Sequence, residues 1–293
     1  MKLSENVQQA VREVQLDLLK QLIHVCQKHH LRFYPCGGTL LGCIRHEGFI
    51  PWDDDIDIDM PREDYDKLCS LAATEFQAPV FLQTAESDPG YFSGHAKLRN
   101  SSTTEIIPED MMFDYDKGIF IDIFPLDHIP DWSIRADWHC IKLFILRNLI
   151  ILGSPAYYAY PHKTIVRLFH PVFELLYRKA TLRRLNLIYE RLCKKYSGRR
   201  KAKRIAPVSA FPLRRAVRWE PELFESFEYK KFESISLPVP ASYDAILHRQ
   251  FGDYRTPKKE KSHHTTVFVS PFLPWRQYME DNRQMSDKGG TKD

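Results

Sequence analysis

The chain has 293 residues, a formal net charge of +4 and a hydrophobic content of 43%. This length can bury a full core, in one large domain or in two smaller ones. No stretch approaches the roughly 18 consecutive apolar residues of a membrane span, and the first residues lack the apolar centre of a secretion signal. The six cysteines are scattered without a C-x-x-C pair, so we expect free thiols in the cytoplasm rather than a zinc site or a disulfide framework.

The first 46 residues predict elements that lead into a glycine turn. Apolar residues at helical spacing over 5–29 predict a packing helix without chemistry. A strand over 31–36 should deliver the chain to Gly37-Gly38, and a brief helix should follow from Thr39, whose hydroxyl could cap it or meet a phosphate oxygen. A glycine pair is usually an ordinary turn. Before a helix, however, it offers backbone N–H groups and a positive helix end, which suit a phosphate.

The segment 55–59 alternates carboxylates with isoleucine. In a strand, Asp55, Asp57 and Asp59 would share one face and the two isoleucines the other. Carboxylates on one face repel one another, and a hard divalent cation held by oxygen ligands relieves that repulsion. An acidic run by itself is typically a solvated loop or a loose calcium site. Directly after the glycine turn, it instead predicts a metal and phosphate site.

Two later strands carry charged residues that could join this site. Lys97 and Arg99 share a strand face, which is typical of a solvated edge. Because the neighbouring strand should carry carboxylates, we favour phosphate contact. Asp122 interrupts the apolar run 118–124, and a buried carboxylate is costly unless it is paired or binds a metal. It either holds backbone amides at a strand end or, as we prefer, is the third carboxylate beside Asp55 and Asp57.

The rest of the chain is less specific. The pattern is helical and basic over 131–204, and the apolar helix expected over 141–152 could lie in a core or against a membrane. Residues 178–204 could attract nucleic acid, a polyanionic substrate or an anionic membrane. We favour the membrane, because the block lacks interleaved aromatic residues for stacking on bases. Prolines and aromatics over 205–278 predict a cap, and 279–293 has the composition of a disordered tail.

Taken together, three stretches resemble the LicD family: GGTLLGCIRHEGFIPWDDDIDIDMPREDYDKL, AKLRNSSTTE and GIFIDIFPLD. The founding members of this family are lipopolysaccharide cholinephosphotransferases, and fukutin and fukutin-related protein are distant animal relatives. The resemblance continues through WEPELF, LPVPASYDAIL, FGDYRTP and the following histidine pair, so that it covers nearly the whole chain. The opening motif is long and specific, whereas the C-terminal pattern is weaker.

The resemblance implies an α+β fold. Its nucleotidyltransferase-like core would be a small mixed sheet flanked by helices, with a helical insertion and a C-terminal cap. We accordingly divide the chain into a catalytic core (1–130), a basic helical segment (131–204), a cap that completes the site (205–278) and a disordered tail (279–293).

The resemblance also implies a reaction and a site. A phosphorylated small alcohol, typically phosphocholine, would move from a CDP-linked donor to a sugar hydroxyl of a surface glycan such as lipopolysaccharide, teichoic acid or capsule, and CMP would leave. Asp55 and Asp57 become the Mg²⁺ or Mn²⁺ pair and Asp122 the third catalytic carboxylate. The donor-binding residues implied are Gly37, Gly38, Thr39, Lys97, Arg99, His263 and His264. The animal relatives' zinc-binding cysteines have no clear counterpart here.

Several alternatives stay open. The transferred group could be glycerol or ribitol phosphate, or the protein could be a true nucleotidyltransferase that attacks the α-phosphorus of a nucleotide. A nucleic-acid-binding protein ranks lower because the basic block lacks aromatic residues for stacking on bases, and a silent membrane-associated scaffold ranks lower because it would leave the aligned carboxylates without purpose. Asp122 could bind a metal or accept the hydroxyl proton. A lipid-linked acceptor would place the protein at the inner face of the cytoplasmic membrane rather than free in the cytoplasm.

Overall fold

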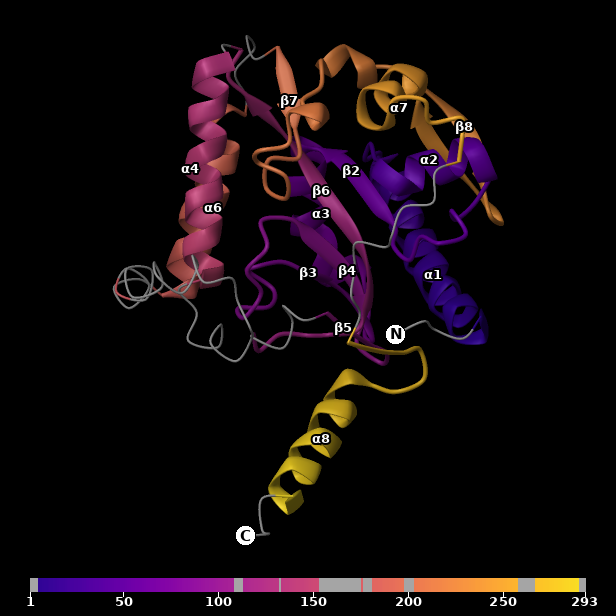
Figure 1. Ribbon diagram of the computed structural model, residues 1–293, viewed down its shortest axis with the longest axis vertical. Helices are drawn as coiled ribbons and strands as arrows, with labels where there is room; N and C mark the ends of the chain where they lie inside the picture. Colours follow the sequence, from indigo (N-terminus) through magenta and orange to yellow (C-terminus); the bar gives the residue numbers. More distant parts are fainter. Residues whose placement is uncertain are drawn as a thin grey trace.

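The computed structural model describes residues 5–107, 113–131, 133–152, 175, 181–197, 203–257 and 267–289. A mixed sheet forms its centre (Figure 1). The strand order is β1 (Tyr34–Pro35), β2 (Asp57–Pro61), β6 (Ile119–Ile129), β4 (Ala96–Asn100) and β3 (Val80–Gln83), and β7 (Arg204–Ala206) pairs with the end of β6. β2 and β6 run parallel, and the other neighbours run antiparallel.

The central strand β6 fixes the position of the site. All of its residues except His128 are buried, as expected for a strand with neighbours on both edges. The apolar run 118–124 therefore predicted this strand correctly, although the strand continues to Ile129. Asp127 is part of it and forms a buried, two-point ion pair with Arg62, at 2.7 Å and 2.8 Å.

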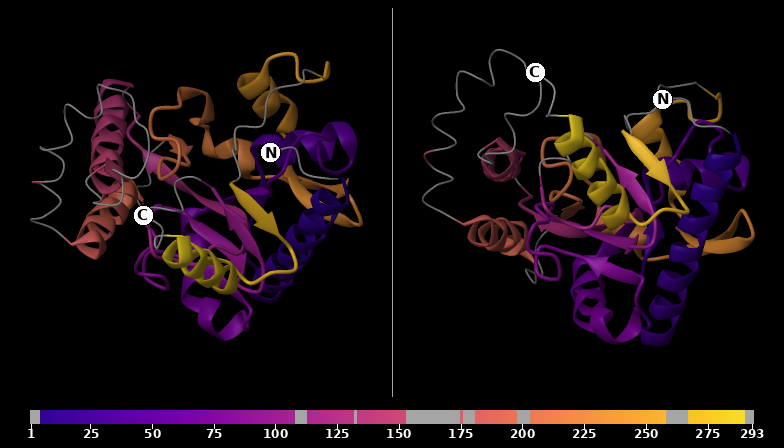
Figure 2. Two further views of the ribbon diagram at one scale, coloured as in Figure 1. Left: turned by 60° about the horizontal axis from the view of Figure 1, so that its bottom comes forward. Right: turned by 90° about the horizontal axis from the view of Figure 1, so that it is seen from below.

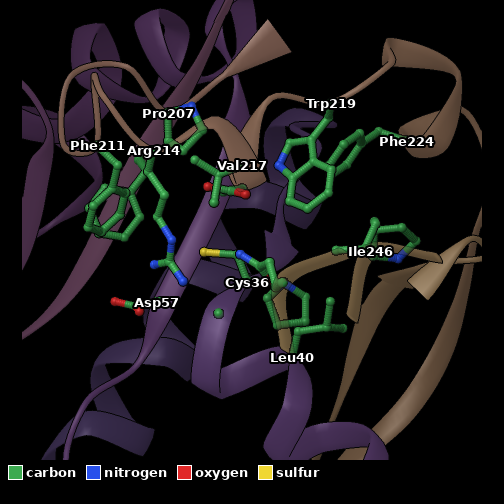
Figure 3. A pocket seen from close by; sticks show the side chains of 16 residues that line it. Cys36, Leu40, Asp57, Pro207, Phe211, Arg214, Val217, Trp219, Phe224 and Ile246 are labelled. Carbon is green, nitrogen blue, oxygen red and sulfur yellow. The ribbon is translucent and has the colours of Figure 1, made fainter. Parts of the chain in front are cut away.

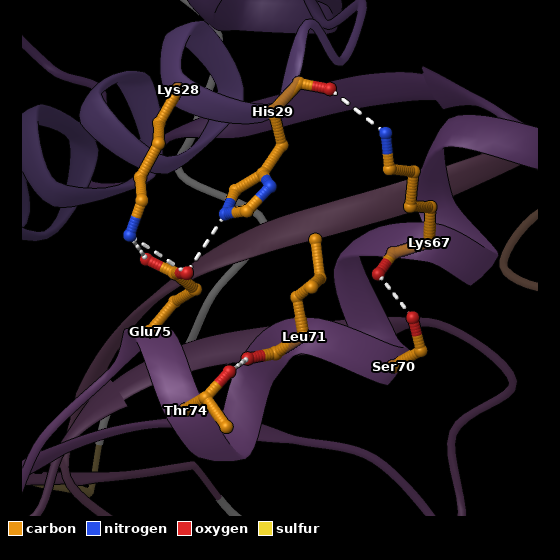
Figure 4. A network of polar contacts seen from close by, with 7 residues as sticks. All are labelled: Lys28, His29, Lys67, Ser70, Leu71, Thr74 and Glu75. Atoms are coloured by element: carbon orange, nitrogen blue, oxygen red, sulfur yellow. Dashed lines mark hydrogen bonds and ion pairs between the residues drawn. The ribbon is translucent and has the colours of Figure 1, made fainter.

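Two helices cover the sheet beside β2, β4 and β6: α1 (Glu5–His29) and α3 (Arg62–Glu75). The predicted packing face of α1 is buried around Leu18, Leu19 and Leu22. Figure 4 shows how the two helices are joined at their ends, where the Glu75 carboxylate lies 2.8 Å from the Lys28 ammonium and 2.8 Å from His29 Nε2. A third helix, α2 (Gly37–His46), connects β1 to the acidic segment.

A second hydrophobic cluster holds the helices of the basic segment. α4 (Ser133–Leu152) and α6 (Leu182–Cys193) pack together through residues such as Leu143, Leu185 and Tyr189, and the short helix η3 (Lys194–Tyr196) follows. Figure 2 shows both helices on one side of the molecule, with α1 on the other. In the described part of the chain, no helix combines the length and the apolar character needed to cross a bilayer.

The C-terminal segment packs on the same core as the N-terminal elements. It contains η4 (Arg215–Val217), η5 (Pro221–Phe224), the hairpin of β8 (Phe227–Phe232) and β9 (Ile235–Pro240), and α7 (Tyr243–Phe251). Trp219, Phe232 and Leu247 belong to one buried cluster with Leu40 and Ile58. Residues of the expected cap therefore form part of the wall around α2 and β2.

The structure describes a helix over part of the segment 279–293, for which the composition predicts a disordered tail. β10 (Phe268–Ser270) pairs with β5 (Thr104–Ile106), and α8 (Trp275–Gly289) then projects from the body (Figure 1). The polar composition of the tail suggested disorder. At the start of α8, the buried Trp275 indole donates a hydrogen bond of 2.7 Å to Asp116 and so fixes the first turn of the helix.

Candidate functional site

The parallel pairing of β2 with β6 brings together two of the predicted carboxylates. Asp57 is the register partner of Asp122. Side chains of paired residues in neighbouring strands point to the same face, and the strands lie about 4.8 Å apart. The two carboxylates are therefore neighbours at the point where β2 begins.

Two groups hold Asp122 in its ionised form: Lys97 on β4 and His95, the residue before β4. Its Oδ1 lies 2.7 Å from the Lys97 ammonium and 3.0 Å from His95 Nε2. Burial alone would raise the pKa of the Asp122 carboxyl, but Lys97 and the hydrogen bond with His95 outweigh burial and hold the pKa below its ordinary value. Lys97 Nζ also lies 3.3 Å from the centroid of the Phe120 ring.

Asp57 lies in the opposite electrostatic situation. Burial raises the pKa of its carboxyl well above the ordinary value, and the negative charges of Asp55, Asp122 and Asp53 raise it further. Lys97 lowers this pKa, but less strongly. Asp57 thus lies where carboxylates converge, and a cation at this point would relieve their repulsion.

Asp55 reaches this position from a loop rather than from the expected strand face. β2 begins at Asp57, so the alternation predicted over 55–59 holds only for its second half. Oxygens of Asp53, Asp54 and Asp55 all lie within 4.8 Å of one another. These are hard oxygen donors, which fit Mg²⁺ or Mn²⁺. Sequence reasoning missed Asp53 and Asp54 as candidate ligands, although they belong to the same acidic run.

The glycine turn makes room for the acidic loop. Gly37 has a φ of +53°, in the left-handed region that favours glycine, and a Cβ there would lie 3.3 Å from Asp57 Oδ2. A Cβ on Gly38 would lie 2.3 Å from Asp53 Oδ2, which is closer than atoms can pack. The helix begins at Gly37 rather than at Thr39. Its positive amino end therefore lies directly against the carboxylate cluster.

Thr39 has a different contact from the one expected of a phosphate ligand. Its buried hydroxyl oxygen accepts a hydrogen bond of 2.8 Å from the Asp57 backbone N–H. It thereby fixes the start of β2 against α2. The helix α1, to which we assigned no chemistry, acts similarly, because Arg12 donates to the Asp53 carbonyl (2.9 Å) and Gln15 to the Asp54 carbonyl (2.8 Å). Nothing in the sequence distinguishes these two residues from surface polar residues.

Of the remaining predicted donor contacts, Arg99 is directed away from the carboxylate cluster by its own hydrogen bonds. Arg99 is fully buried and donates to Gln83 Oε1 and to the Gly118 carbonyl, both at 2.5 Å. These bonds direct its guanidinium toward β3 and the residue before β6. His263 and His264 lie outside the described residues.

A small cavity of about 50 Å³ opens beside Asp57, between α2 and the C-terminal segment (Figure 3). Its walls are largely apolar and include Trp219 and Phe211. Arg214 extends into the same space, and Figure 3 shows its guanidinium beside Asp57. Sequence reasoning missed Arg214, because no motif surrounds it and its distance from Asp57 in the chain is large.

Comparisons with known proteins point to the same stretch of chain. Residues 30–142 match a family model described as LicD/FKTN/FKRP, nucleotidyltransferase domain. The chain is similar to the lipopolysaccharide cholinephosphotransferase LicD of Haemophilus influenzae, with 32% identity over 40% of this chain and 43% of that protein. It is also similar to an uncharacterized protein of Rickettsia typhi, with 43% identity over 46% of this chain and 40% of the relative. The chain therefore spans less than half the length of these relatives.

Proposed function

We propose that the protein is a phosphotransferase of the LicD family that modifies a glycan, because residues 30–142 match the model of LicD/FKTN/FKRP nucleotidyltransferase domains. The mixed sheet flanked by helices agrees with the α+β fold expected of a nucleotidyltransferase-like domain. The donor is a CDP-linked alcohol phosphate, for which CDP-choline is the first candidate, since a similar protein is a cholinephosphotransferase. The acceptor is a sugar hydroxyl of a cell-surface glycan, and CMP is the leaving group.

One observation carries this proposal: the register pair of Asp57 and Asp122 next to the acidic loop and the amino end of α2. Several carboxylates beside a positive helix end suit a substrate that brings both phosphate groups and metal ions. A binding module or a scaffold would gain nothing from such a costly cluster of like charges.

The carboxylates around Asp57 are the residues that would hold Mg²⁺ or Mn²⁺. Asp57 and Asp55, with Asp53 as a further candidate, supply the oxygen ligands. When bound, the metal would neutralise charge on the donor's phosphates and orient them. Thr39 and the helix α1 contribute by holding the backbone of the acidic segment in place.

The acceptor hydroxyl attacks the phosphorus that bears the alcohol, the bond from this phosphorus to the CMP oxygen breaks so that CMP leaves, and the hydroxyl proton passes to water. We assign Asp122 an electrostatic role rather than that of the base, because a carboxyl whose pKa is held down by Lys97 and His95 is a weak proton acceptor. Asp122 instead holds the Lys97 ammonium in place beside the cluster through their ion pair of 2.7 Å.

Incubation of the purified protein with Mg²⁺, an acceptor glycan and a panel of CDP-alcohols tests the reaction. We expect CMP release with one member of the panel, first of all CDP-choline, and complete loss of release on chelation with EDTA, restored by added Mg²⁺. Preference for CDP-glycerol or CDP-ribitol would identify the transferred group as glycerol phosphate or ribitol phosphate and leave the rest of the proposal unchanged. Pyrophosphate release from a nucleoside triphosphate would show nucleotidyl transfer instead of the proposed reaction. Turnover that persists in EDTA would contradict the requirement for a metal ion.

We also propose that the helical segment contacts an anionic membrane surface that presents a lipid-linked acceptor. α4 exposes Ile134, Trp138 and Ile145 along one stripe, with Lys142 beside it, and α6 exposes arginines. An apolar stripe flanked by cations suits anionic lipid. Trp138→Ser should at least halve co-sedimentation with vesicles that contain phosphatidylglycerol. Equal sedimentation with anionic and zwitterionic vesicles would contradict this contact, and concentration-dependent dimers lost in Trp138→Ser would assign the stripe to a second copy.

A further inference from the structure

Among the charged groups of the described residues that most affect Asp57, the carboxylates outnumber the cations. Asp53, Asp55 and Asp122 all act on Asp57, whereas Lys97 is engaged by Asp122 at 2.7 Å. Arg99 is engaged by Gln83 and Gly118. Both cations that the sequence suggested for the donor's phosphates therefore already have protein acceptors. Apart from a bound metal, a further positive group would help to hold an anionic donor that enters this region.

Arg214 supplies such a group from the C-terminal segment. It lies in the loop before η4, and together with Gly37 and Asp57 it lines the cavity beside α2. In Figure 3 its guanidinium points toward Asp57 and Cys36. The Phe211 ring supports it, with the centroid 5.9 Å from the Arg214 Cζ. Among the residues that the structure describes, no carboxylate forms an ion pair with it.

The neighbouring arginines show that this orientation is imposed by the fold. Arg215 and Arg218 both turn the other way and bind the Asp137 carboxylate on α4, with Arg218 Nη1 at 2.7 Å from Oδ1. These two ion pairs tie the loop to α4. Because these ion pairs fix the loop to α4, the loop places the third guanidinium, that of Arg214, at a defined position in the cavity.

We propose that Arg214 is a substrate-binding residue that receives a phosphate group of the nucleotide donor beside Asp57. A guanidinium is planar and binds phosphate oxygens through two parallel hydrogen bonds, which makes it well suited to a diphosphate. Gly37, the first residue of α2, lines the same cavity, so that a bound phosphate would also face the positive end of this helix. The identity of the donor as a CDP compound rests on the proposed function, whereas the anion chemistry of the cavity does not.

The cavity also contains an acid, Asp59, whose carboxyl is buried and hydrogen-bonded to the Cys36 thiol. It lies on the strand two residues beyond Asp57. Burial raises the pKa of this carboxyl to about 7, so near neutral pH it is only partly charged and repels a bound anion less than an ordinary aspartate would.

The test is the binding of CDP and of inorganic pyrophosphate to the full chain with Mg²⁺, measured by isothermal titration calorimetry. We expect Arg214→Ala to weaken CDP binding at least tenfold, and Arg214→Lys to recover part of the loss because it keeps the charge without the two-point geometry. Arg183→Ala, which removes an exposed arginine on α6, is the matched control and should stay within about twofold of the native affinity. Because Arg214 and Arg183 are exposed, all of these variants should have the same thermal unfolding temperature as the native protein.

Equal CDP affinity in the native protein and in Arg214→Ala would overturn the proposal, and so would a native chain that binds neither CDP nor pyrophosphate. An equal loss in Arg183→Ala would also overturn it, because the effect would then be general charge attraction. CMP release is measured separately. If CDP binding depends on Arg214 but no CMP is released, the binding site stands and the proposed reaction is rejected. If Arg214→Ala leaves CMP release unchanged, the reaction stands and the role of Arg214 in binding the donor is rejected.

Discussion

Replacing Asp57 with asparagine should reduce CMP release by more than about 100-fold. Substitution of the residues that merely support metal ligands commonly costs 10- to 100-fold, and Asp57 stands at the centre of the cluster, between Asp122 on the neighbouring strand and the acidic loop. Asparagine keeps the shape of the side chain and loses the charge. The measurement is the initial rate of CMP release at saturating Mg²⁺ and donor.

The same substitution should leave the fold intact, and without metal it should not lower the thermal unfolding temperature. The ionised Asp57 carboxylate is repelled by Asp55, Asp122 and Asp53, so its removal relieves the folded state. With Mg²⁺, the native protein should gain more stability than the variant, because a ligand stabilises the state that binds it. Asp17→Asn, the same change on an exposed part of α1, is the control and should keep native activity. Native turnover in Asp57→Asn would contradict the assignment of the site.

Replacing Arg62 with methionine should destabilise the protein by about 3–5 kcal/mol, which is the usual cost of leaving one partner of a buried ion pair alone. Arg62 is buried and binds both oxygens of Asp127, which is fully buried in β6. Arg32→Met offers a matched control, since Arg32 pairs with Asp64 at an exposed position and should cost about 0–1 kcal/mol. Urea unfolding at neutral pH gives both values.

The pH dependence identifies the cause of this loss. Burial raises the pKa of the Asp127 carboxyl, and Arg62 counteracts part of that rise. Without Arg62 the folded-state pKa rises further, so the folded variant binds a proton that the unfolded chain releases, and its stability falls as the pH rises through the unfolded and then the folded pKa. The deficit should therefore shrink toward acidic pH. The double variant Arg62→Met, Asp127→Leu should recover part of the stability. A deficit that is independent of pH, or a double variant weaker than the single one, would rule out the unpaired carboxylate as the cause.

Local pattern was sufficient for the parts of the site that depend on neighbouring residues. The apolar run around Asp122 required a buried strand, because only such a strand is apolar on both faces. The glycine pair required a tight turn into a helix, and the structure gives the reason in the approach of the Asp53 and Asp57 carboxylates to Gly38 and Gly37. The order of these motifs also identified the family that the comparison found.

Alternation along a strand was a weaker guide where the contacts come from other strands. Lys97 and Arg99 share a face, as predicted, but only Lys97 meets Asp122. Arg99 is bound by Gln83 on β3 and by the Gly118 carbonyl, and the pairing of β3 with β4 could not be read from either strand alone. Asp55 follows a turn in which the Asp53 N–H donates a hydrogen bond to the Ile50 carbonyl, and β2 begins two residues after Asp55, at Asp57.

The sequence by itself determined the buried strand, the glycine turn, the acidic run and the resemblance to the LicD family, because each of these follows from residues that are adjacent or periodic in the chain. Only the tertiary structure decided that Asp57 lies beside Asp122, that α1 holds the acidic loop, and that Arg214 faces the cavity. These relations join segments far apart in the chain, and they arise from strand pairing and helix packing, in which hydrogen bonds and buried surface, rather than local spacing, select the partners.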